Sequence, residues 1–307
     1  GESTITEAMF EAMRCAVTTL PPDVRAGLER ALAEEEDPVA CAQLDSSLRN
    51  ARQAEAGQGL VCADTGFPLF FVRAGSATQL NGGFPVLWQA AAEAVSRATA
   101  QNYLRPTMVD PLARSNPGNN IGPGMPKIEL RFAGDGDGLD IVAAPKGGGS
   151  EIFGTFYRMM YPADGVEGVK KFVIQCVRES CYAGKICPPA IVGIGIGGTA
   201  DLCMRLAKEA ALLCPVGSRS SDPVLAALEA DLLSAARRLG LGPMGVRGIN
   251  AVMGLRIRKA VTHTAALPAA FNAQCLVGRR WCAHISSEGD VSYTGDLTEM
   301  EDMCDGE

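Results

Sequence analysis

The sequence has few basic residues, and this shortage excludes one large class of function. Its 307 residues include 28 Lys and Arg against 35 Asp and Glu, which gives a formal net charge of −7. A nucleic-acid groove needs a basic face that neutralises phosphates. We therefore expect no nucleic-acid partner.

Long apolar segments and an export signal are also missing. No apolar run approaches the ~20 residues that span a bilayer. The first twenty residues, GESTITEAMFEAMRCAVTTL, lack the basic stretch and apolar core of a signal peptide. We therefore expect a soluble, cytoplasmic protein with no membrane partner.

Cysteine, by contrast, is plentiful. The 11 cysteines are odd in number and scattered along the chain. In a large chain without an export signal, this pattern favours reduced thiols or metal ligands over a disulfide framework. Most of them are expected to be small buried apolar side chains.

Hydrophobic periodicity predicts an α/β (α+β) fold, a mixed sheet with flanking helices and a helical N-terminal segment over residues 1–60. We expect a single domain over residues 1–307, with an acidic tail over 290–307. A Pro-, Gly- and Asn-rich stretch at 105–127 predicts a long loop, and Asp222 is expected to cap a helix ahead of Pro223.

Further helices are predicted at 86–104, 165–184, 199–213 and 222–242, and strands at 69–75, 127–132, 139–145, 188–198, 251–275 and 279–287. The strands 127–132 and 139–145 are expected to be joined by the turn AGDGDG.

Two glycine-rich strings have competing interpretations. GIGIGGT, residues 193–199, follows a predicted strand and opens a helix, but its spacing is not that of a dinucleotide fingerprint. APKGGGSEIFG, residues 144–154, is either a bulge or hairpin loop, or a nest of N–H groups facing an anion beside Lys146.

Several longer strings together resemble one known family. CADTG, RPTMVDPLARSNPGNN, PKGGGSE, PADGVEGVKKFV, CPPAIVGIGIGGTAD, GPMG and THTAALPAAFNAQC occur in this order between residues 60 and 285. They resemble the α subunit, or N-terminal catalytic domain, of iron–sulfur hydro-lyases, the class I fumarases and L(+)-tartrate dehydratases.

The resemblance implies a [4Fe–4S] cluster held by three cysteines. The implied ligands are Cys62, Cys187 and Cys275, and Asp64 is implied to face the substrate. An iron without a fourth cysteine can act as a Lewis acid towards a hydroxylated acid. Cys181, six residues before Cys187, is the alternative choice for the second ligand.

The resemblance also implies how a small dicarboxylate is bound. Arg105 would grip a carboxylate through its bidentate fork, with backbone amides near Gly148 and Gly149 and the cation of Lys146 assisting. His263, in the THTAALP segment, is implied to contact a substrate carboxylate. Each also has a structural alternative, as a solvated loop residue or a hydrogen-bonded histidine.

Three neighbouring residues are assigned structural roles. His284, the second of the 2 histidines, lies outside every motif. Arg279 and Arg280, just after the third cysteine, are interpreted as supporting or interface charges.

Departures from the family pattern leave the substrate open. Ala63 stands where the family commonly has Gln, which makes room for a substituted diacid. The expected activity is hydration or dehydration of the fumarate/malate type, with L(+)-tartrate dehydratase or hydration of a substituted fumarate as the alternative. A separate β subunit in an α₂β₂ assembly is expected, because no β-type domain follows residue 285. A non-catalytic iron–sulfur scaffold and an NAD-dependent oxidoreductase are the alternatives from other classes.

Overall fold

The computed structural model describes residues 1–298. The second half of the acidic tail, residues 299–307 with Cys304, therefore lies outside the described residues. The chain divides into two compact units, each built from separate stretches of sequence. The first unit contains residues 1–21, 51–148 and 279–296, and the second contains 22–50, 149–278 and the residues from 297.

The first unit is a five-stranded mixed sheet with helices packed on it. The strand order is β2-β1-β3-β8-β9. Its elements are α1 (Glu2–Thr18), β1 (Phe67–Ala74), α4 (Val86–Ala100), β2 (Lys127–Phe132), β3 (Leu139–Lys146), β8 (Trp281–Ile285) and β9 (Val291–Thr294).

Strands β2 and β3 do not pair with each other, as the expected hairpin would require. Strand β1 lies between them, parallel to β2 and antiparallel to β3. The turn residue Gly136 instead accepts a hydrogen bond from Ala77 N, beyond the end of β1, at 3.0 Å. The apolar run of β1 explains the arrangement, because a strand buried on both faces belongs in the middle of a sheet.

The core of the first unit lies between its sheet and the two helices α1 and α4. Met9, Leu87, Phe70 and Ile141 are each 0% exposed. In α1 the buried residues Ile5, Met9 and Met13 recur at a spacing of four, which places them on one face of the helix. Each such side chain contributes about 1.5–3 kcal/mol on burial.

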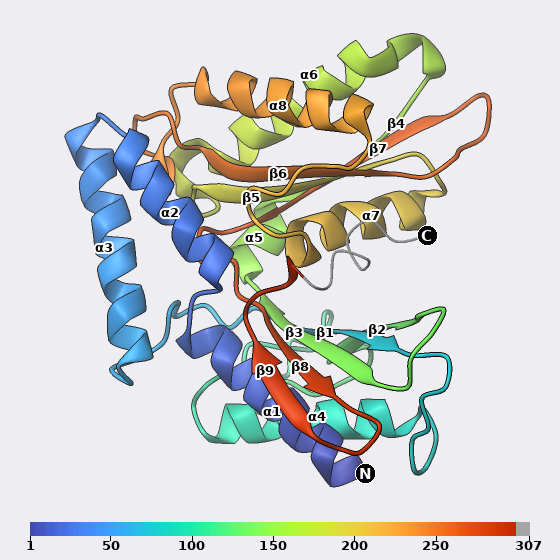
Figure 1. The fold of residues 1–307 in the computed structure, drawn as a ribbon. Coiled ribbons are helices and arrows are strands. Elements are labelled where there is room, and N and C mark those ends of the chain that lie inside the picture. Colours follow the sequence, from blue (N-terminus) through green and yellow to red (C-terminus); the bar gives the residue numbers. More distant parts are fainter. Residues whose placement is uncertain (299–307) are drawn as a thin grey trace. The chain divides into compact units, whose positions relative to one another are not determined.

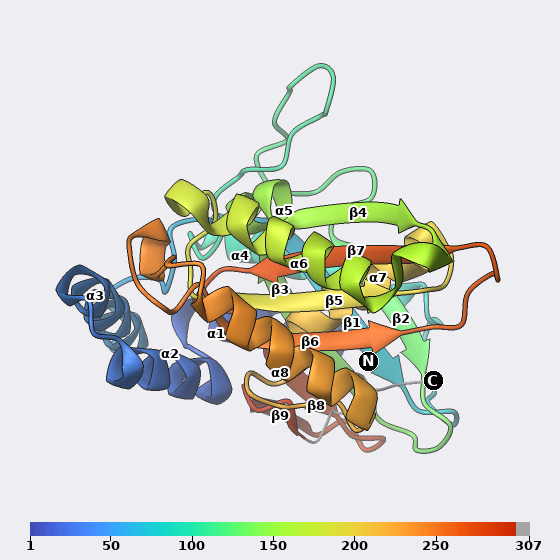
Figure 2. The same ribbon diagram turned by 90° about the horizontal axis from the view of Figure 1, so that it is seen from above.

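The second unit is a four-stranded sheet of order β4-β7-β5-β6. Helices α6 and α8 cover one face of this sheet and α7 covers the other (Figures 1 and 2). Its elements are α2 (Pro22–Glu34), most of α3 (Pro38–Glu55), α5 (Gly148–Phe153), β4 (Thr155–Met160), α6 (Gly165–Cys181), β5 (Ala190–Ile196), α7 (Ala200–Leu213), α8 (Pro223–Arg237), β6 (Val252–Lys259) and β7 (Leu267–Gln274), with short 3₁₀ turns at Pro162–Asp164, Tyr182–Gly184 and Pro243–Gly245.

The glycines of GIGIGGT allow helix α7 to pack closely on strand β5. A Cβ on Gly193 would lie 2.0 Å from Ala207 O, and one on Gly195 would lie 2.1 Å from Cys203 O. Both oxygens belong to the backbone of α7, so only glycine fits at these two positions. Helix–strand packing thus explains this string without a bound nucleotide.

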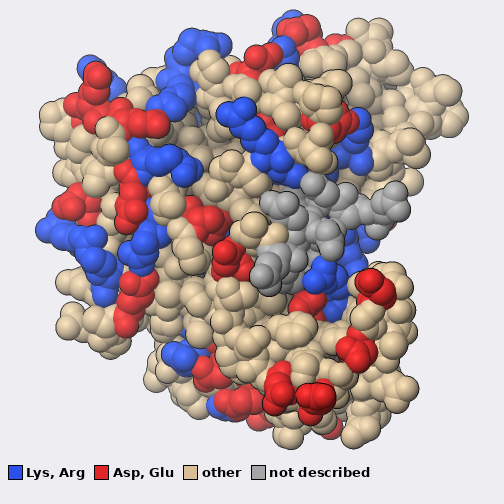
Figure 3. Space-filling view, in the orientation of Figure 1, with Lys and Arg blue, Asp and Glu red and all other residues tan. Residues whose placement is uncertain are grey.

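The surface of α2 and α3 carries charges of both signs. Arg49 pairs with Asp45 at 3.1 Å, and Arg237 pairs with Glu34. Figure 3 shows Lys and Arg interspersed with Asp and Glu over this part of the surface. Exposed pairs of this kind contribute little to stability.

The predicted α/β class is confirmed, and so is the helical N-terminal segment, which forms α1, α2 and α3. Asp222 caps α8, because its Oδ1 accepts a hydrogen bond of 2.9 Å from Val224 N. The elements α5, β4 and β9 were not predicted from the sequence, and β9 lies within the expected tail. Within residues 1–298, none of the helices is long and apolar enough to cross a membrane.

Candidate active site

The segment CADTG forms the loop that leads into strand β1 of the first unit. Val61 N donates to Val17 O at 2.9 Å, which anchors the loop to the end of α1. Cys62 is partly exposed, and its Sγ accepts a hydrogen bond of 3.4 Å from Asp64 N. This hydrogen bond fixes the sulfur relative to the backbone of Asp64.

The carboxylate of Asp64 joins two backbone segments. Its Oδ1 accepts a hydrogen bond from Gly66 N at 3.1 Å, and its Oδ2 accepts one from Gly148 N at 2.6 Å. The buried Arg279 donates through its guanidinium to Asp64 O and, at 3.4 Å, to Thr65 O. The loop is therefore held from both sides, and Arg279 has the supporting role predicted for it.

Gly66 lies in tight contact with strand β3. Its φ is +70°, and a Cβ there would lie 1.9 Å from Lys146 O. The Lys146 side chain is 0% exposed. The cation predicted to assist a substrate is therefore buried at the end of β3, beneath the loop.

Thr65 connects the same loop to the segment that contains Arg105. Thr65 Oγ1 accepts a hydrogen bond of 2.6 Å from Arg105 N. The Arg105 side chain is exposed, as a residue that grips a soluble diacid must be. The backbone of Arg105 is thus held in place while its guanidinium is exposed.

Asn120, which the sequence analysis did not single out, holds this segment in place. Its side chain is 0% exposed. Its Nδ2 donates to Arg105 O at 2.9 Å, and its Oδ1 accepts from Thr107 N at 2.8 Å and Met108 N at 3.1 Å. The asparagines of NPGNN could have indicated this role, because Asn side chains often form hydrogen bonds with nearby backbone in turns.

In the second unit, Cys187 and Cys275 lie on adjacent backbone segments. Leu276 N donates to Cys187 O at 2.9 Å, and Ile191 pairs with Gln274 where β5 lies against β7. Both cysteines are partly exposed. Two of the three predicted ligands are thus brought together at one end of this sheet from positions 88 residues apart.

Cys181, the alternative second ligand, is in a different environment. Its side chain is 0% exposed, and its Sγ donates to Ala251 O at 3.7 Å. Burial raises the pKa of this thiol to about 12. A thiol that stays protonated is a poor metal ligand, so the structure favours Cys187 over Cys181.

His263 lies at the other end of the same sheet. It is exposed in the loop between β6 and β7, where its Nδ1 accepts a hydrogen bond of 3.1 Å from Ala265 N. Cys275 follows the last residue of β7, and His263 precedes the first. Eight residues of extended strand separate its two ends by about 23 Å, so the structure does not bring His263 to Cys275 within one chain.

The predicted nest of backbone amides is partly occupied. Gly148 N donates to Asp64, as described above, and Gly149 begins the second unit, where a Cβ on it would lie 3.4 Å from Lys185 O. His284 instead faces Asp140 across the β3–β8 ladder, with Nδ1 2.6 Å from Oδ1. This position agrees with the structural role expected for His284.

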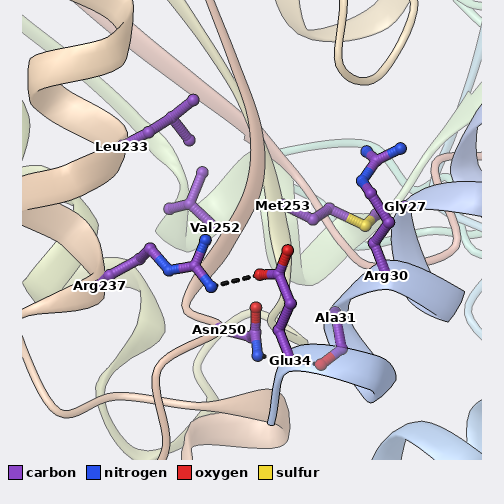
Figure 4. Close-up of a pocket in the computed structure, with 9 residues that line it drawn as sticks. All are labelled: Gly27, Arg30, Ala31, Glu34, Leu233, Arg237, Asn250, Val252 and Met253. Atoms are coloured by element: carbon purple, nitrogen blue, oxygen red, sulfur yellow. Dashed lines mark hydrogen bonds and ion pairs between the residues drawn. The ribbon is translucent and has the colours of Figure 1, made fainter.

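A separate cavity of about 120 Å³ lies in the second unit, between α2 and α8, and contains none of the predicted site residues. Figure 4 shows Glu34 pointing towards Arg237, while the guanidinium of Arg30 points away from both. The ion pair between Glu34 and Arg237 already neutralises the arginine. This cavity is therefore a poor site for a dicarboxylate.

The chain resembles known proteins over most of its length. A family model described as fumarate hydratase (Fumerase) matches residues 6–284. A Methanocaldococcus jannaschii protein provisionally named L(+)-tartrate dehydratase subunit alpha is 38% identical over 277 residues, which cover 90% of this chain and 95% of that protein. L(+)-tartrate dehydratase subunit alpha of Escherichia coli K12 is 32% identical over 276 residues, covering 90% of this chain and 89% of that protein.

These matches define a hydro-lyase. The chain belongs to the fumarate hydratase (Fumerase) family.

Proposed function

We propose that this chain is the α subunit of a [4Fe–4S]-dependent hydro-lyase that acts on a small dicarboxylate, with Cys62, Cys187 and Cys275 as the cluster ligands. The observation that carries the proposal is the hydrogen bond between Leu276 N and Cys187 O, which brings two partly exposed cysteines to one end of a sheet. The donor set fits the group, because three thiolates are soft ligands of the kind that iron–sulfur clusters take.

When bound, a cluster with one iron free of cysteine supplies a Lewis acid that eases the departure of a substrate hydroxyl. The residues of the chain then bind and orient the substrate. Arg105 grips one carboxylate through paired N–H donors. Asp64, whose two oxygens are fixed by Gly66 N and Gly148 N, is held in one orientation in which it faces the substrate.

His263 keeps its proposed role as a contact to a substrate carboxylate. Because β7 separates it from Cys275 in one chain, His263 serves the cluster-containing site of another copy. Lys146 contributes positive charge from its buried position, and Gly149 remains a proposed source of a backbone N–H donor.

Two candidate substrates fit the proposed reaction type. The fumarate/malate type follows from the family whose model matches most of the chain. L(+)-tartrate is favoured by the names of the relatives that are 31–38% identical. The exposed Ala63 leaves space beside Asp64 for a second hydroxyl or another substituent.

A separate β subunit completes the enzyme in this proposal, as an α₂β₂ assembly. The relatives are named as alpha subunits, and this chain covers 89–95% of their length. The β subunit supplies the remaining substrate contacts and the general base.

The test is to purify the chain anaerobically with its β subunit and to measure iron, sulfide and absorbance near ~400 nm. Cys62→Ser, Cys187→Ser and Cys275→Ser are expected to lose the cluster. Cys181→Ala, the matched control, is expected to keep it. A cluster that survives in Cys187→Ser and disappears in Cys181→Ala would contradict the ligand assignment.

The same preparations identify the substrate. Hydration of fumarate and mesaconate and dehydration of malate and L(+)-tartrate are assayed with both subunits present. Turnover of tartrate alone would select the alternative substrate. A cluster without turnover of any of these acids would indicate a scaffold, and a colourless protein that binds NADH would indicate an oxidoreductase.

A further inference from the structure

The third predicted ligand, Cys275, begins a tight turn that follows strand β7. Gly278 N donates to Cys275 O at 3.0 Å, and this hydrogen bond closes the turn. Leu276, the second residue of the turn, is 6% exposed, and its N–H donates to Cys187 O at 2.9 Å. The turn is therefore fixed within the second unit and bonded to the segment that contains the second predicted ligand.

The last residue of the turn, Gly278, packs against the second unit. Its φ is +43°, and a Cβ there would lie 2.6 Å from Ile191 Cδ1 and 2.8 Å from Val24 Cγ2. A glycine is therefore needed at this position. The next residue, Arg279, belongs to the first unit. The peptide bond between residues 278 and 279 is thus a point where the chain passes from the second unit to the first.

Arg279 connects the turn to the loop of the first predicted ligand, Cys62. Its side chain is 3% exposed, and its guanidinium donates to Asp64 O and, from another nitrogen, to Thr65 O. Asp64 N in turn donates to Cys62 Sγ at 3.4 Å. The backbone of Asp64 is therefore bonded to the arginine on one side and to the ligand sulfur on the other.

The covalent chain limits the distance between Arg279 and Cys275. The first and last Cα atoms of a β-turn lie within about 7 Å of each other, and consecutive Cα atoms are about 3.8 Å apart. The Cα of Arg279 therefore lies within about 11 Å of the Cα of Cys275. Because this limit comes from the covalent chain, it holds for any arrangement of the two units.

We propose that the turn and Arg279 together position the three predicted ligands for the cluster. Arg279 is the positioning residue that brings Cys62 to Cys275. The inference deepens the proposed function and rests on it for the identity of the ligands. A guanidinium suits this role, because its planar fork presents N–H groups to two consecutive carbonyls at once. A lysine has the same charge without the fork.

The three ligands differ in how they depend on the arginine. Cys187 and Cys275 are joined within the second unit by the bond from Leu276 N, so this pair forms without Arg279. Cys62 belongs to the first unit and depends on Arg279 for its distance to the pair. Removing the arginine should therefore release one ligand and leave two, whereas a general loss of folding would release all three.

The first experiment uses the full chain without a cluster, so that its outcome does not depend on the proposed function. The short bifunctional thiol reagent dibromobimane is added, and the linked peptides are identified by mass spectrometry. The unchanged protein should give a link between Cys187 and Cys275, and a link from Cys62 to one of this pair. In Arg279→Gln the link from Cys62 should fall at least tenfold, while the link within the pair persists as the internal control.

The second experiment uses the chain with its β subunit after anaerobic reconstitution of the cluster. Arg279→Gln should raise the rate of alkylation of Cys62 at least tenfold, while the other two ligands stay protected. Arg279→Lys, which keeps the charge, should give an intermediate rate. Arg73→Gln is the matched control, because the Arg73 guanidinium bonds Asp140 in the same unit at 2.9 Å. It should leave the alkylation rate of Cys62 unchanged.

A further pair of variants keeps every side chain of the protein. Two glycines inserted between residues 278 and 279 lengthen the connection from the turn to the arginine. The same insertion between residues 21 and 22, another point where the chain passes between the units, is the control. Only the first insertion should weaken the link from Cys62. Circular dichroism verifies that each variant is folded, and the insertions decide the question if Arg279→Gln does not fold.

Four results would overturn the inference. These are no link from Cys62 in the unchanged protein, an undiminished link from Cys62 in folded Arg279→Gln, loss of the link within the pair together with the link from Cys62, and two insertions with the same effect. A wild-type chain that acquires no cluster, although its links respond as expected, would instead reject the proposed function and leave the positioning by Arg279 in place.

Discussion

The carboxylate of Asp64 accepts a hydrogen bond of 2.6 Å from the backbone N–H of Gly148, 84 positions further along the chain. This bond joins the cysteine-containing loop of the first unit to the glycine run that follows β3. A second bond, from Gly66 N, fixes the other carboxylate oxygen. The orientation of Asp64 therefore depends on having two acceptor oxygens.

Replacing Asp64 by Asn leaves one acceptor where two are needed. Either Gly66 N or Gly148 N loses its partner, at a cost of about 1–3 kcal/mol in unfolding free energy. Activity with the β subunit is expected to fall at least 100-fold. Asp222→Asn is the control, because Asn also caps helices well. Denaturant titration and turnover measure both effects, and a fully active Asp64→Asn enzyme would remove this residue from the mechanism.

Alanine substitutions at two glycines with similar φ angles distinguish the cost of a steric clash from the cost of backbone strain. Gly66 has φ +70° and Gly57 has φ +76°, but a Cβ would meet Lys146 O at 1.9 Å only at Gly66, with nothing within 4 Å at Gly57. Gly57→Ala is expected to cost about 1–2 kcal/mol from the left-handed conformation. Gly66→Ala should cost more than twice as much. Equal unfolding free energies for the two variants would show that the loop moves freely away from β3.

The buried thiols predict a loss of stability in alkali. Burial raises the pKa of Cys176, Cys181 and Cys282 from 9.0 to about 12. Above pH 9 the unfolded chain releases these protons while the folded chain retains them, so the unfolding free energy falls as pH rises from 9 towards 12. The slope is up to about 1.4 kcal/mol per pH unit for each group.

Urea titrations between pH 7 and pH 10.5 measure this slope. Cys181→Ala should reduce the slope by the contribution of one thiol. Cys41→Ala, at a partly exposed cysteine, is the control and should leave the slope unchanged. In cluster-free protein at pH 8, alkylation is expected at Cys62 and Cys187 before Cys181. A pH-independent stability would contradict the burial of these thiols.

Asn120→Ala tests the segment that presents Arg105. The change removes the donor to Arg105 O and the acceptor for Thr107 N and Met108 N. We expect KM for the diacid to rise about tenfold, equivalent to ~1.4 kcal/mol of binding, while cluster absorbance stays unchanged. Asn116→Ala is the control, because its amide is exposed and bonds Pro106 O and Gly118 N. An unchanged KM in Asn120→Ala would separate this asparagine from substrate binding.

Individual helices and strands could be predicted well from the sequence, but the order in which the strands pair could not. Helices such as α6 and α7 follow from apolar spacing within one segment, and the cap at Asp222 from a single residue type. Strand order depends on contacts between distant segments, which is why β1 was not placed between β2 and β3. Strand β4 was missed because its exposed Tyr157, Arg158 and Met159 give no alternation of apolar and polar residues.

The site shows the same division. Cys62, Asp64 and Arg105 were predicted as site residues through motif resemblance, and the structure joins the backbone of Arg105 to the loop that contains Asp64. The contact of Arg279 with the backbone of Asp64 spans 215 positions and leaves no local pattern in the sequence. The separation of His263 from Cys275 was equally hidden, because residues close in sequence can lie at opposite ends of one strand.

The two units are interleaved along the chain, since each is assembled from stretches that alternate with those of the other. Neither unit can therefore be excised as one continuous fragment. During synthesis the first sheet cannot be completed until β8 and β9 have left the ribosome, after nearly all of the second unit has been translated. A truncated product that ends before residue 279 would lack strands β8 and β9 of that sheet, and Arg279, which holds the cysteine loop. We expect such a product to be degraded by proteases.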